Sequence, residues 1–250
     1  MKAVEKPNLP EMAEAILIGE KYFKILEKPL EKLGINAVSV PGNGFVDPRL
    51  SSHGDLSVLH MGSNVLWLAP HLRQSRFADR LIAMGFALDY PDISQSATYP
   101  GDAQLNVCIC GKYAACNLSI VPAEIVSNLT AGGFELIDCR QGYARCSVCI
   151  VTEGAIITAD RGVEVVARKA GLDVLLTEPG YIALDGFDYG FIGGSSFKIS
   201  RGKLAFTGSL DEHPNKNDIL RFLKAHEVEA VYLTERPIFD IGSGIPITEK

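Results

Sequence analysis

Apolar and polar positions follow one pattern that recurs five times along the chain. Each unit has a short apolar run, a helical stretch and a second apolar run, and such periodicity is the main sequence signal for secondary structure. The pattern predicts helices over residues 23–33, 74–84, 122–131, 161–170 and 217–226. It predicts a strand after each helix, over residues 35–40, 86–89, 134–139, 172–176 and 228–233.

A glycine marks the junction between the predicted helix and strand in four of the units. A residue in the left-handed conformation commonly closes the last carbonyls of a helix, and glycine adopts that conformation without a Cβ clash. These glycines are Gly34, Gly85, Gly133 and Gly171, whereas the fifth junction, His226-Glu227-Val228, has none. The glycines therefore support the predicted boundaries.

Four of the predicted helices follow a β-hairpin, in which two β-rich runs flank a short turn that contains glycine. The hairpins begin at Leu56, Leu105, Ser147 and Ser196. The first helix has a single run before it, residues 13–18, and the last run of the chain, residues 241–248, lacks a second arm. Pairing of these two runs would remove both open strand edges, and Pro246 would need a position that requires no backbone amide.

These elements predict an α/β fold in one domain, residues 1–250, built from five ββαβ-type units. The approximate units are residues 13–55, 56–104, 105–146, 147–195 and 196–248. We expect strands toward a central axis and helices outside. Pairing of the N- and C-terminal strands would close this arrangement into a five-fold pseudosymmetric α/β-propeller.

The composition is that of a globular protein, with 47% hydrophobic and 22% charged residues, and it excludes disorder, collagen and coiled coil. The net charge of −6 opposes binding to nucleic acids. No stretch offers the roughly twenty apolar residues of a membrane helix, and the charged N-terminus is unlike a secretory signal. We therefore expect a cytoplasmic protein whose six cysteines are free thiols. The sequence leaves a homo-oligomer open.

Two glycine-rich segments resemble sequences of the pentein superfamily, the α/β-propellers that include the guanidino-group modifying enzymes. The block Gly193-Gly194-Ser195-Ser196-Phe197 is similar to the Gly-Gly strand starts of that superfamily, and residues 242–248 resemble the agmatine-deiminase signature. The resemblance implies a hydrolase or transferase with a nucleophilic cysteine in the last strand. Ile245, Pro246 and Ile247 occupy that stretch here, so the chain resembles a branch that lacks the usual C-terminal nucleophile.

The segments that lead into the five inner strands each carry a glycine, and in a ring they converge at one end of the axis. This end is the predicted pocket. Its predicted catalytic residues are His53 as acid/base, Asp55 to orient the imidazole or bind a substrate cation, and Cys146 as nucleophile. The predicted ligand-binding residues are Asp102, Gln141, Tyr143, Asp188, Asp240 and Ser243. Converging carboxylates favour a small cationic ligand, an amine or a guanidino compound, and we expect no cofactor and no metal.

Structural roles compete with these assignments. His53 and Asp55, two apart in an extended segment, would point the same way, but a surface histidine beside a turn aspartate fits the sequence equally. Asp102 and Asp188 are equally consistent with turn residues.

Cys146 is expected at the start of an inner strand, next to Arg145. Its thiol is either activated by neighbouring charge or buried and inert. Cys146 and Cys149 have CxxC spacing, but they would lie along a strand, which disfavours a zinc site.

Two functions of different class remain open. One is an enzyme of the pentein type that acts on a small cationic or amide substrate through Cys146 or through His53 and Asp55. The other is a non-catalytic ring that binds a ligand or a partner and has lost the terminal nucleophile. Selective reactivity of a single cysteine would favour the enzyme.

Overall fold

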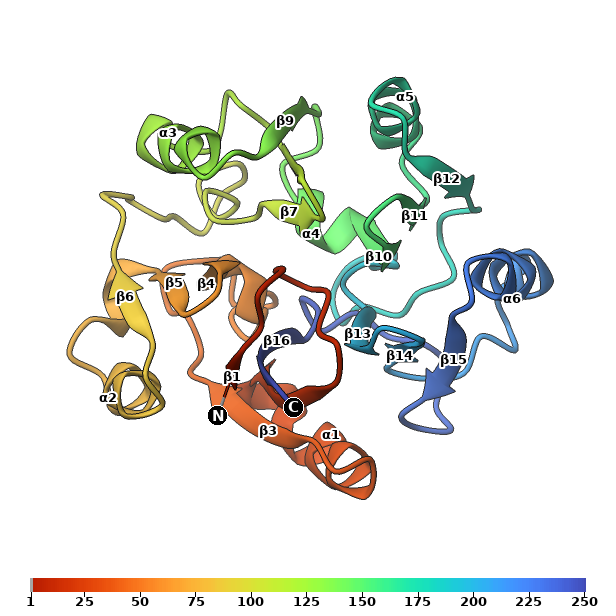
Figure 1. Cartoon of the computed structure of the whole chain (residues 1–250), viewed down its shortest axis with the longest axis horizontal. Coiled ribbons are helices and arrows are strands. Elements are labelled where there is room, and N and C mark those ends of the chain that lie inside the picture. The colour runs from red at the N-terminus through yellow and green to blue at the C-terminus, as the bar shows by residue number, and fades with distance from the viewer. Residues whose placement is uncertain (1) are drawn as a thin grey trace.

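The computed structural model describes residues 2–250 as a mixed α/β protein with five small β-sheets. The sheets surround a common centre, and the longer helices lie at the periphery (Figure 1). Four of the sheets have three strands each. Their strands are β4 (Val58–Gly62), β5 (Val65–Leu68) and β6 (Ala87–Asp89); β7 (Cys108–Cys110), β8 (Tyr113–Cys116) and β9 (Glu135–Asp138); β10 (Val148–Thr152), β11 (Ala155–Thr158) and β12 (Asp173–Leu176); and β13 (Ser196–Ser200), β14 (Lys203–Phe206) and β15 (Glu229–Tyr232).

The three-stranded sheets share one topology. The first two strands of each sheet form an antiparallel hairpin, and a helix then returns the chain so that the third strand runs parallel to the second. A parallel pairing needs such a crossover. The crossover helices are α2 (Arg76–Ala83), α3 (Ala123–Ala131), α5 (Arg161–Lys169) and α6 (Lys216–Ala225).

The remaining sheet joins segments from both ends of the described chain. Its order is β1 (Lys2–Ala3), β16 (Ile245–Glu249), β2 (Ala13–Gly19) and β3 (Asn36–Val40), with α1 (Glu20–Lys32) between the last two. β16 runs antiparallel to both β1 and β2, with Ile245 opposite Leu17. The predicted pairing of the N-terminal and C-terminal runs is therefore confirmed. The register is irregular between Pro246 and Thr248, as expected where a proline interrupts an inner ladder.

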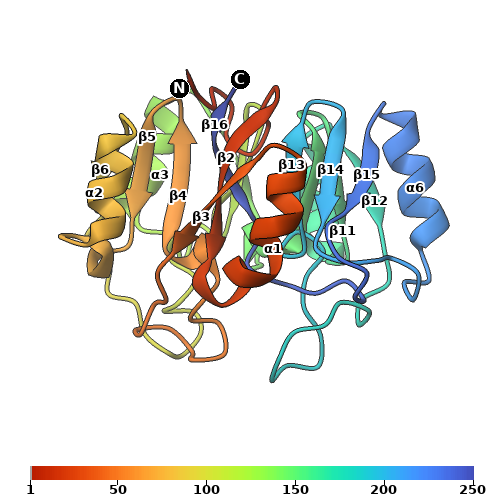
Figure 2. The same cartoon turned by 90° about the horizontal axis from the view of Figure 1, so that it is seen from below.

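Side-chain packing joins neighbouring sheets, which remain separate as hydrogen-bonded units. Leu17 of β2 and Leu66 of β5 lie in one buried cluster, and Cys149 of β10 and Leu204 of β14 lie in another. The helices cover the outer edges of the sheets (Figure 2). Each turns an apolar stripe inward, as Phe77, Ala78 and Leu81 do in α2.

The predicted helices are confirmed, and the largest error is at α1, which begins at Glu20 rather than residue 23. The junction glycines Gly34, Gly85, Gly133 and Gly171 all have positive φ, between 74° and 93°. Glu227, at the fifth junction, has a φ of 58°. The left-handed turn is thus kept where glycine is missing.

Two segments that the sequence predicted to be extended are short helices. Residues 54–56 form the 3₁₀-helix η1 (Gly54–Leu56). Cys146 lies in the single turn α4 (Ala144–Ser147), ahead of β10 rather than within it. Both changes reposition predicted site residues. A further 3₁₀-helix, η2 (Pro70–Leu72), follows β5.

All six cysteines are buried and free, as predicted. No helix within residues 2–250 has the length and apolar character needed to cross a membrane.

Candidate functional site

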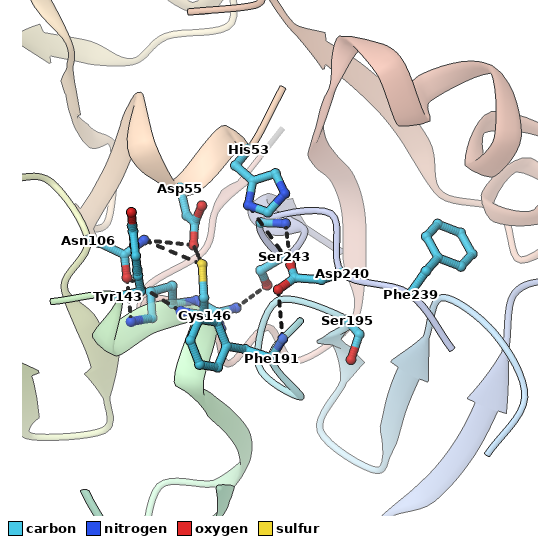
Figure 3. A network of polar contacts seen from close by, with 12 residues as sticks. His53, Asp55, Asn106, Tyr143, Cys146, Phe191, Ser195, Phe239, Asp240 and Ser243 are labelled. Atoms are coloured by element: carbon cyan, nitrogen blue, oxygen red, sulfur yellow. Dashed lines mark hydrogen bonds and ion pairs between the residues drawn. The ribbon is translucent and has the colours of Figure 1, made fainter. Parts of the chain in front are cut away.

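Three segments that precede strands bring polar side chains together in one buried cluster (Figure 3). His53 precedes η1, Cys146 lies in α4 ahead of β10, and Asp240 lies in the loop ahead of β16. Asp55 joins them from η1, and each of the four residues is at most 3% exposed. Such burial means that each polar group needs a partner inside the protein or in a ligand.

Cys146 and Asp55 are joined directly. The thiol of Cys146 donates to Oδ2 of Asp55 at 2.7 Å. Nδ2 of Asn106 donates to the same oxygen at 2.9 Å, and Oδ1 of Asn106 accepts from the backbone amide of Arg145 at 2.7 Å. Asn106 therefore fixes both the carboxylate and the turn that carries the thiol. The sequence analysis missed Asn106, whose signal is a single polar residue within the apolar run 105–110.

Burial shifts the pKa values of both members of this pair upward. Burial raises the pKa of Asp55, and the nearby His53 and the hydrogen bonds from Cys146 and Asn106 oppose that rise. Burial also raises the pKa of the Cys146 thiol well above its usual value, and the charges of Asp55 and Asp240 raise it further. Cys146 is therefore a protonated thiol when no ligand is bound.

Arg145 does not activate the thiol in the way its position in the sequence indicated. Its guanidinium lies 3.3 Å from Oδ1 of Asn8 and 3.3 Å from the carbonyl of Val148, and it also donates to Oγ of Ser243. These contacts occupy the guanidinium away from Cys146. The only cationic group next to the thiol in sequence is thus used to hold the surrounding backbone.

His53 pairs with Asp240 rather than with Asp55. Nδ1 of His53 lies 3.9 Å from Oδ1 of Asp240, and Asp240 accepts the backbone amides of Phe191 at 2.8 Å and Gly242 at 2.9 Å. No hydrogen bond joins His53 to Asp55. Nε2 of His53 and Oδ1 of Asp55 both lack a hydrogen-bond partner in the described part of the chain. Of the two residues, His53 lines the cavity described below.

Two glycines make room for this cluster. A Cβ on Gly194 would lie 2.0 Å from Oδ1 of Asp240, and one on Gly242 would lie 2.5 Å from Cβ of His53. Both distances are far below van der Waals contact. The glycines therefore have a local physical role, which is to let Asp240 and His53 approach the neighbouring backbone.

A cavity of about 260 Å³ opens beside the cluster. Its polar lining comes from His53, Cys146, Asp188 and Asp240. The rest of the lining is apolar or aromatic and consists of Leu50, Tyr143, Leu184, Phe187, Tyr189 and Phe191. The volume lies just below the range of about 300–1,000 Å³ for sites that hold drug-sized ligands, so the cavity suits a small molecule.

Three of the predicted ligand-binding residues, Tyr143, Asp188 and Asp240, line this cavity. The other three do not. Asp102 is buried and accepts the hydroxyl of Tyr143 at 2.7 Å.

Gln141 and Ser243 likewise point to protein groups. Nε2 of Gln141 donates to Asp160 at 3.1 Å, and the hydroxyl of Ser243 donates to the carbonyl of Ser196 at 3.0 Å. Their hydrogen bonds therefore support the neighbouring segments of the site.

His53, Asp55 and Cys146 could also hold a metal ion. Each offers one ligand atom, and the three atoms lie within 4.8 Å of one another. Nitrogen, oxygen and sulfur ligands of these types are those used by zinc. Cys149 lies apart in β10, so the CxxC pair is not brought together there. The expectation of a metal-free protein stays a prediction.

A larger cavity, of about 650 Å³, is lined by Lys6, Lys198 and Arg201 among others. Two of its lysines already have partners in the protein. Nζ of Lys6 pairs with Glu153 at 2.5 Å, and Nζ of Lys198 donates to the carbonyl of Arg201 at 2.8 Å. The chemistry-bearing cluster thus lies at the smaller cavity.

Several solved enzyme structures are similar to this chain in fold. An amidinotransferase of saxitoxin biosynthesis from Microseira wollei is 10% identical with a TM-score of 0.63, and the match covers 99% of this chain and 97% of that chain. DDAH from Pseudomonas aeruginosa, solved with citrulline, is 9% identical with a TM-score of 0.57, covering 95% and 100%. An agmatine deiminase from C. jejuni with substrate bound is 10% identical with a TM-score of 0.55, covering 99% and 96%. These similarities establish the pentein fold of the guanidino-group modifying enzymes, as the sequence resemblance predicted.

No curated protein matches the sequence. A family described as "Family of unknown function (DUF6873)" matches residues 17–245. Because this match spans most of the chain, the protein belongs to that family.

Proposed function

We propose that the protein is a hydrolase or transferase that acts on a small organic cation, an amine or a guanidino compound. The observation that carries the proposal is the thiol of Cys146 at the wall of the cavity, with His53 on the same wall and Asp55 at 2.7 Å. A thiol, an imidazole and carboxylates are the groups that nucleophilic catalysis requires. The enzymes that share the fold include an amidinotransferase and an agmatine deiminase, which supports a cationic substrate of this class.

In this proposal, Asp240, Cys146 and His53 have different roles in the reaction. Asp240 places a carboxylate at the cavity for the cationic head, and Cys146 is the nucleophile. Its Sγ attacks the central carbon of a guanidino group, a C–S bond forms, and the C–N bond to the leaving amine breaks. His53 takes the thiol proton on Nε2 and delivers it to the leaving nitrogen. Water in a hydrolase, or an amine in a transferase, then displaces the sulfur and restores the thiol.

Ligand binding would also activate the nucleophile. The pKa of Cys146 is raised by burial and by two carboxylates, so the thiol stays protonated in the free protein. A cation bound between the thiol and Asp240 would offset the carboxylate charges and favour the thiolate. The thiolate of Cys146 would therefore form when the cationic substrate is bound.

A non-catalytic binding protein is the second candidate, and the same raised pKa supports it. A buried thiol beside a carboxylate is ordinarily unreactive. In that case the cavity would bind a small cation without chemistry, and Cys146 would serve as a hydrogen-bond donor to Asp55.

We further propose that the five sheets are the units of one closed α/β-propeller domain over residues 1–250. The common topology of the three-stranded sheets and the pairing of β16 with β2 support this arrangement. In it, the nucleophile lies in the third unit, whereas the resemblance places the cysteine of the related enzymes in the last strand.

The enzyme proposal is tested by measuring release of ammonia and of ureido products from guanidino compounds with and without a carboxylate, namely butylguanidine, agmatine, arginine and methylated arginines. The variants are Cys146→Ser and, as a matched control, Cys139→Ser, whose Sγ lies 3.6 Å from the carbonyl of Gln141 outside the cavity. We expect turnover that Cys146→Ser abolishes and Cys139→Ser retains. Turnover that survives Cys146→Ser would remove Cys146 as nucleophile. Binding of cations without turnover would establish the second candidate.

A further inference from the structure

The loop between β12 and β13 builds an aromatic wall along the cavity. Leu184, Phe187, Tyr189 and Phe191 of this loop all line it. Phe187 is 38% exposed and Tyr189 is 43% exposed, so their faces are open to a ligand. Large exposed aromatic side chains beside a cavity are costly to leave in water and mark a binding surface.

Contacts on the outside of the loop hold this wall in place. Nη1 of Arg49 donates to the carbonyl of Gly186 at 2.8 Å, and its guanidinium lies 4.0 Å from the centroid of the Phe187 ring. Lys21 pairs with Asp185 at 2.7 Å. The wall is therefore formed before any ligand binds, which lowers the entropic cost of binding.

The charges at the cavity all favour a cation. Asp188 and Asp240 contribute carboxylates, and no lysine or arginine within residues 2–250 is among the lining residues. The two arginines next to lining residues in sequence are already engaged. Arg49 binds Asp47 and stacks on Phe187, and Arg145 binds Asn8 and Ser243 on the far side of Cys146.

A ligand carboxylate would therefore lie near two acidic groups and meet no lysine or arginine among the lining residues. Partial removal of an unpaired charge from water is unfavourable, and so is the repulsion between like charges, whereas a cationic head near aromatic faces is stabilised by their quadrupoles. An alkyl or aryl body would also replace water on the exposed rings.

We infer that the site takes an organic monocation with an apolar or aromatic body, and that it discriminates against ligands that carry a carboxylate. This inference rests on the proposed function, because it assumes that the cavity holds the cationic substrate. Beyond the proposed function, the inference specifies the cations that the site accepts. These are alkyl- or arylguanidines and amines, and amino acids are rejected. Phe187 and Tyr189 are then specificity-determining residues.

Calorimetric binding to Cys146→Ser, which prevents turnover, tests the inference with three matched probes. Butylguanidine has the cationic head and an apolar body, 4-guanidinobutanoate has a carboxylate in place of the terminal methyl group, and butylurea removes the charge. We expect butylguanidine to bind at least about tenfold more tightly than each of the other two, a difference of about 1.4 kcal/mol. Phe187→Ala and Tyr189→Ala should each weaken it several-fold. Tyr181→Ala should have no effect, since Tyr181 is a 49% exposed aromatic of the same loop that does not line the cavity.

A gain of function provides the reverse test. Tyr189→Arg places a cation at the wall and should shift the preference toward 4-guanidinobutanoate. Equal or tighter binding of 4-guanidinobutanoate to the unmodified wall would overturn the inference and leave the proposed function intact. Equal binding of butylurea would instead remove the cation site and with it the proposed function. Failure of all three probes to bind would overturn both.

Discussion

Cys146 and Asp55 control each other's charge at the scale of single residues. Their hydrogen bond is short, both are buried, and each carboxylate near the thiol makes the thiolate less favourable. The pKa of Asp55 is raised less than burial alone would raise it, because the nearby His53 and the hydrogen bonds from Cys146 and Asn106 oppose the rise. Removal of one of these negative charges should therefore lower the pKa of the Cys146 thiol.

Asp55→Asn is expected to lower the pKa of Cys146 and so to speed its alkylation by iodoacetamide at pH 8. The expected increase is on the order of tenfold, the effect of about one pKa unit on the thiolate fraction. Mass spectrometry of the peptide that contains Cys146 measures the rate as a function of pH. Asp102→Asn is the control, since Asp102 is also buried but contacts Tyr143. An unchanged alkylation profile in Asp55→Asn would contradict the coupling.

The sequence predicted the central members of the site better than its periphery. His53, Asp55 and Cys146 were expected together because they precede inner strands, and their ligand atoms do lie within 4.8 Å. The role of Asp55 in orienting His53 stays a prediction. Two-residue spacing puts side chains on one face only in extended backbone, whereas residues 54–56 are helical, and Nδ1 of His53 lies 3.9 Å from Asp240. Asn106 could not be foreseen, because its role depends on tertiary approach to α4.

At the scale of elements, the helix-to-strand junctions depend on one backbone conformation. Four junctions use glycine at positive φ, and the fifth uses Glu227 at 58°. A left-handed conformation costs a residue with a Cβ about 1–2 kcal/mol. The junction after α6 is thus strained relative to the others.

Glu227→Gly is expected to stabilise the protein by up to about 1 kcal/mol, since relief of strain exceeds the added entropy of the unfolded chain. Gly85→Ala is the converse test and should destabilise by about 1–2 kcal/mol. A Cβ on Gly85 would meet nothing within 4 Å, so conformation alone would account for the loss. Chemical denaturation measures both. Destabilisation by Glu227→Gly would show that the Glu227 side chain makes a contribution larger than the strain.

Helices long enough to show a period were predictable, and helices of a single turn were not. Helices of eight or more residues, such as α2, display their apolar stripe in the sequence. The four-residue turn α4 and the three-residue η1 contain too few positions to define a period. Both follow from how neighbouring segments pack, which is why the errors of prediction gather at the site.

At the scale of the whole molecule, β16 is the strand on which the sheet of β1, β16, β2 and β3 depends. It lies between β1 and β2, and every residue from Ile245 to Glu249 is buried. Deletion of residues 241–250 should therefore leave β1 without a partner and β2 with one open edge, and yield an aggregating protein without a cooperative transition. A truncated protein that melts as sharply as the full chain would contradict the five-unit arrangement.

Ile247→Ala is the milder form of this test. Ile247 is fully buried in β16, and truncation of a buried isoleucine to alanine costs about 2–5 kcal/mol. Lys250→Ala is the control, because the Lys250 side chain is exposed and its backbone amide still donates to the carbonyl of Met12. A loss of stability in Ile247→Ala no larger than that of the control would show that β16 is not part of the cooperative core.

Stability should decrease as the pH falls from 7.5 to 5.5, in part through His60. Burial lowers the pKa of His60 below 6.5 in the folded protein, so the unfolded chain binds a proton that the folded one does not. This stabilising contribution is present above pH 6.5 and is lost below it. Asp55 and Asp102, whose pKa values are raised, act in the opposite sense as the pH rises above 3.8.

His60→Gln isolates the contribution of His60, since glutamine can still donate to the carbonyl of Ser63 that contacts Nε2 of His60. We expect Tm to fall less with acid in His60→Gln than in the wild type, by on the order of 2–4 °C for each 1 kcal/mol removed. Calorimetry at a series of pH values measures the difference. Parallel curves for the two proteins would contradict it.

The pairing of β2 with β16 also sets the order in which the protein can be completed during synthesis. Residues 13–19 need residues 245–249 as partners, and at about 5–20 residues per second the ribosome takes roughly ten to forty-five seconds to make the intervening chain. For that time β2 has β3 on one side and an open edge on the other, with the apolar side chains of Ile16 and Leu17 uncovered by β16. β2 is therefore synthesised long before it can be completed by β16, and the nascent chain carries an exposed edge that chaperones would have to protect.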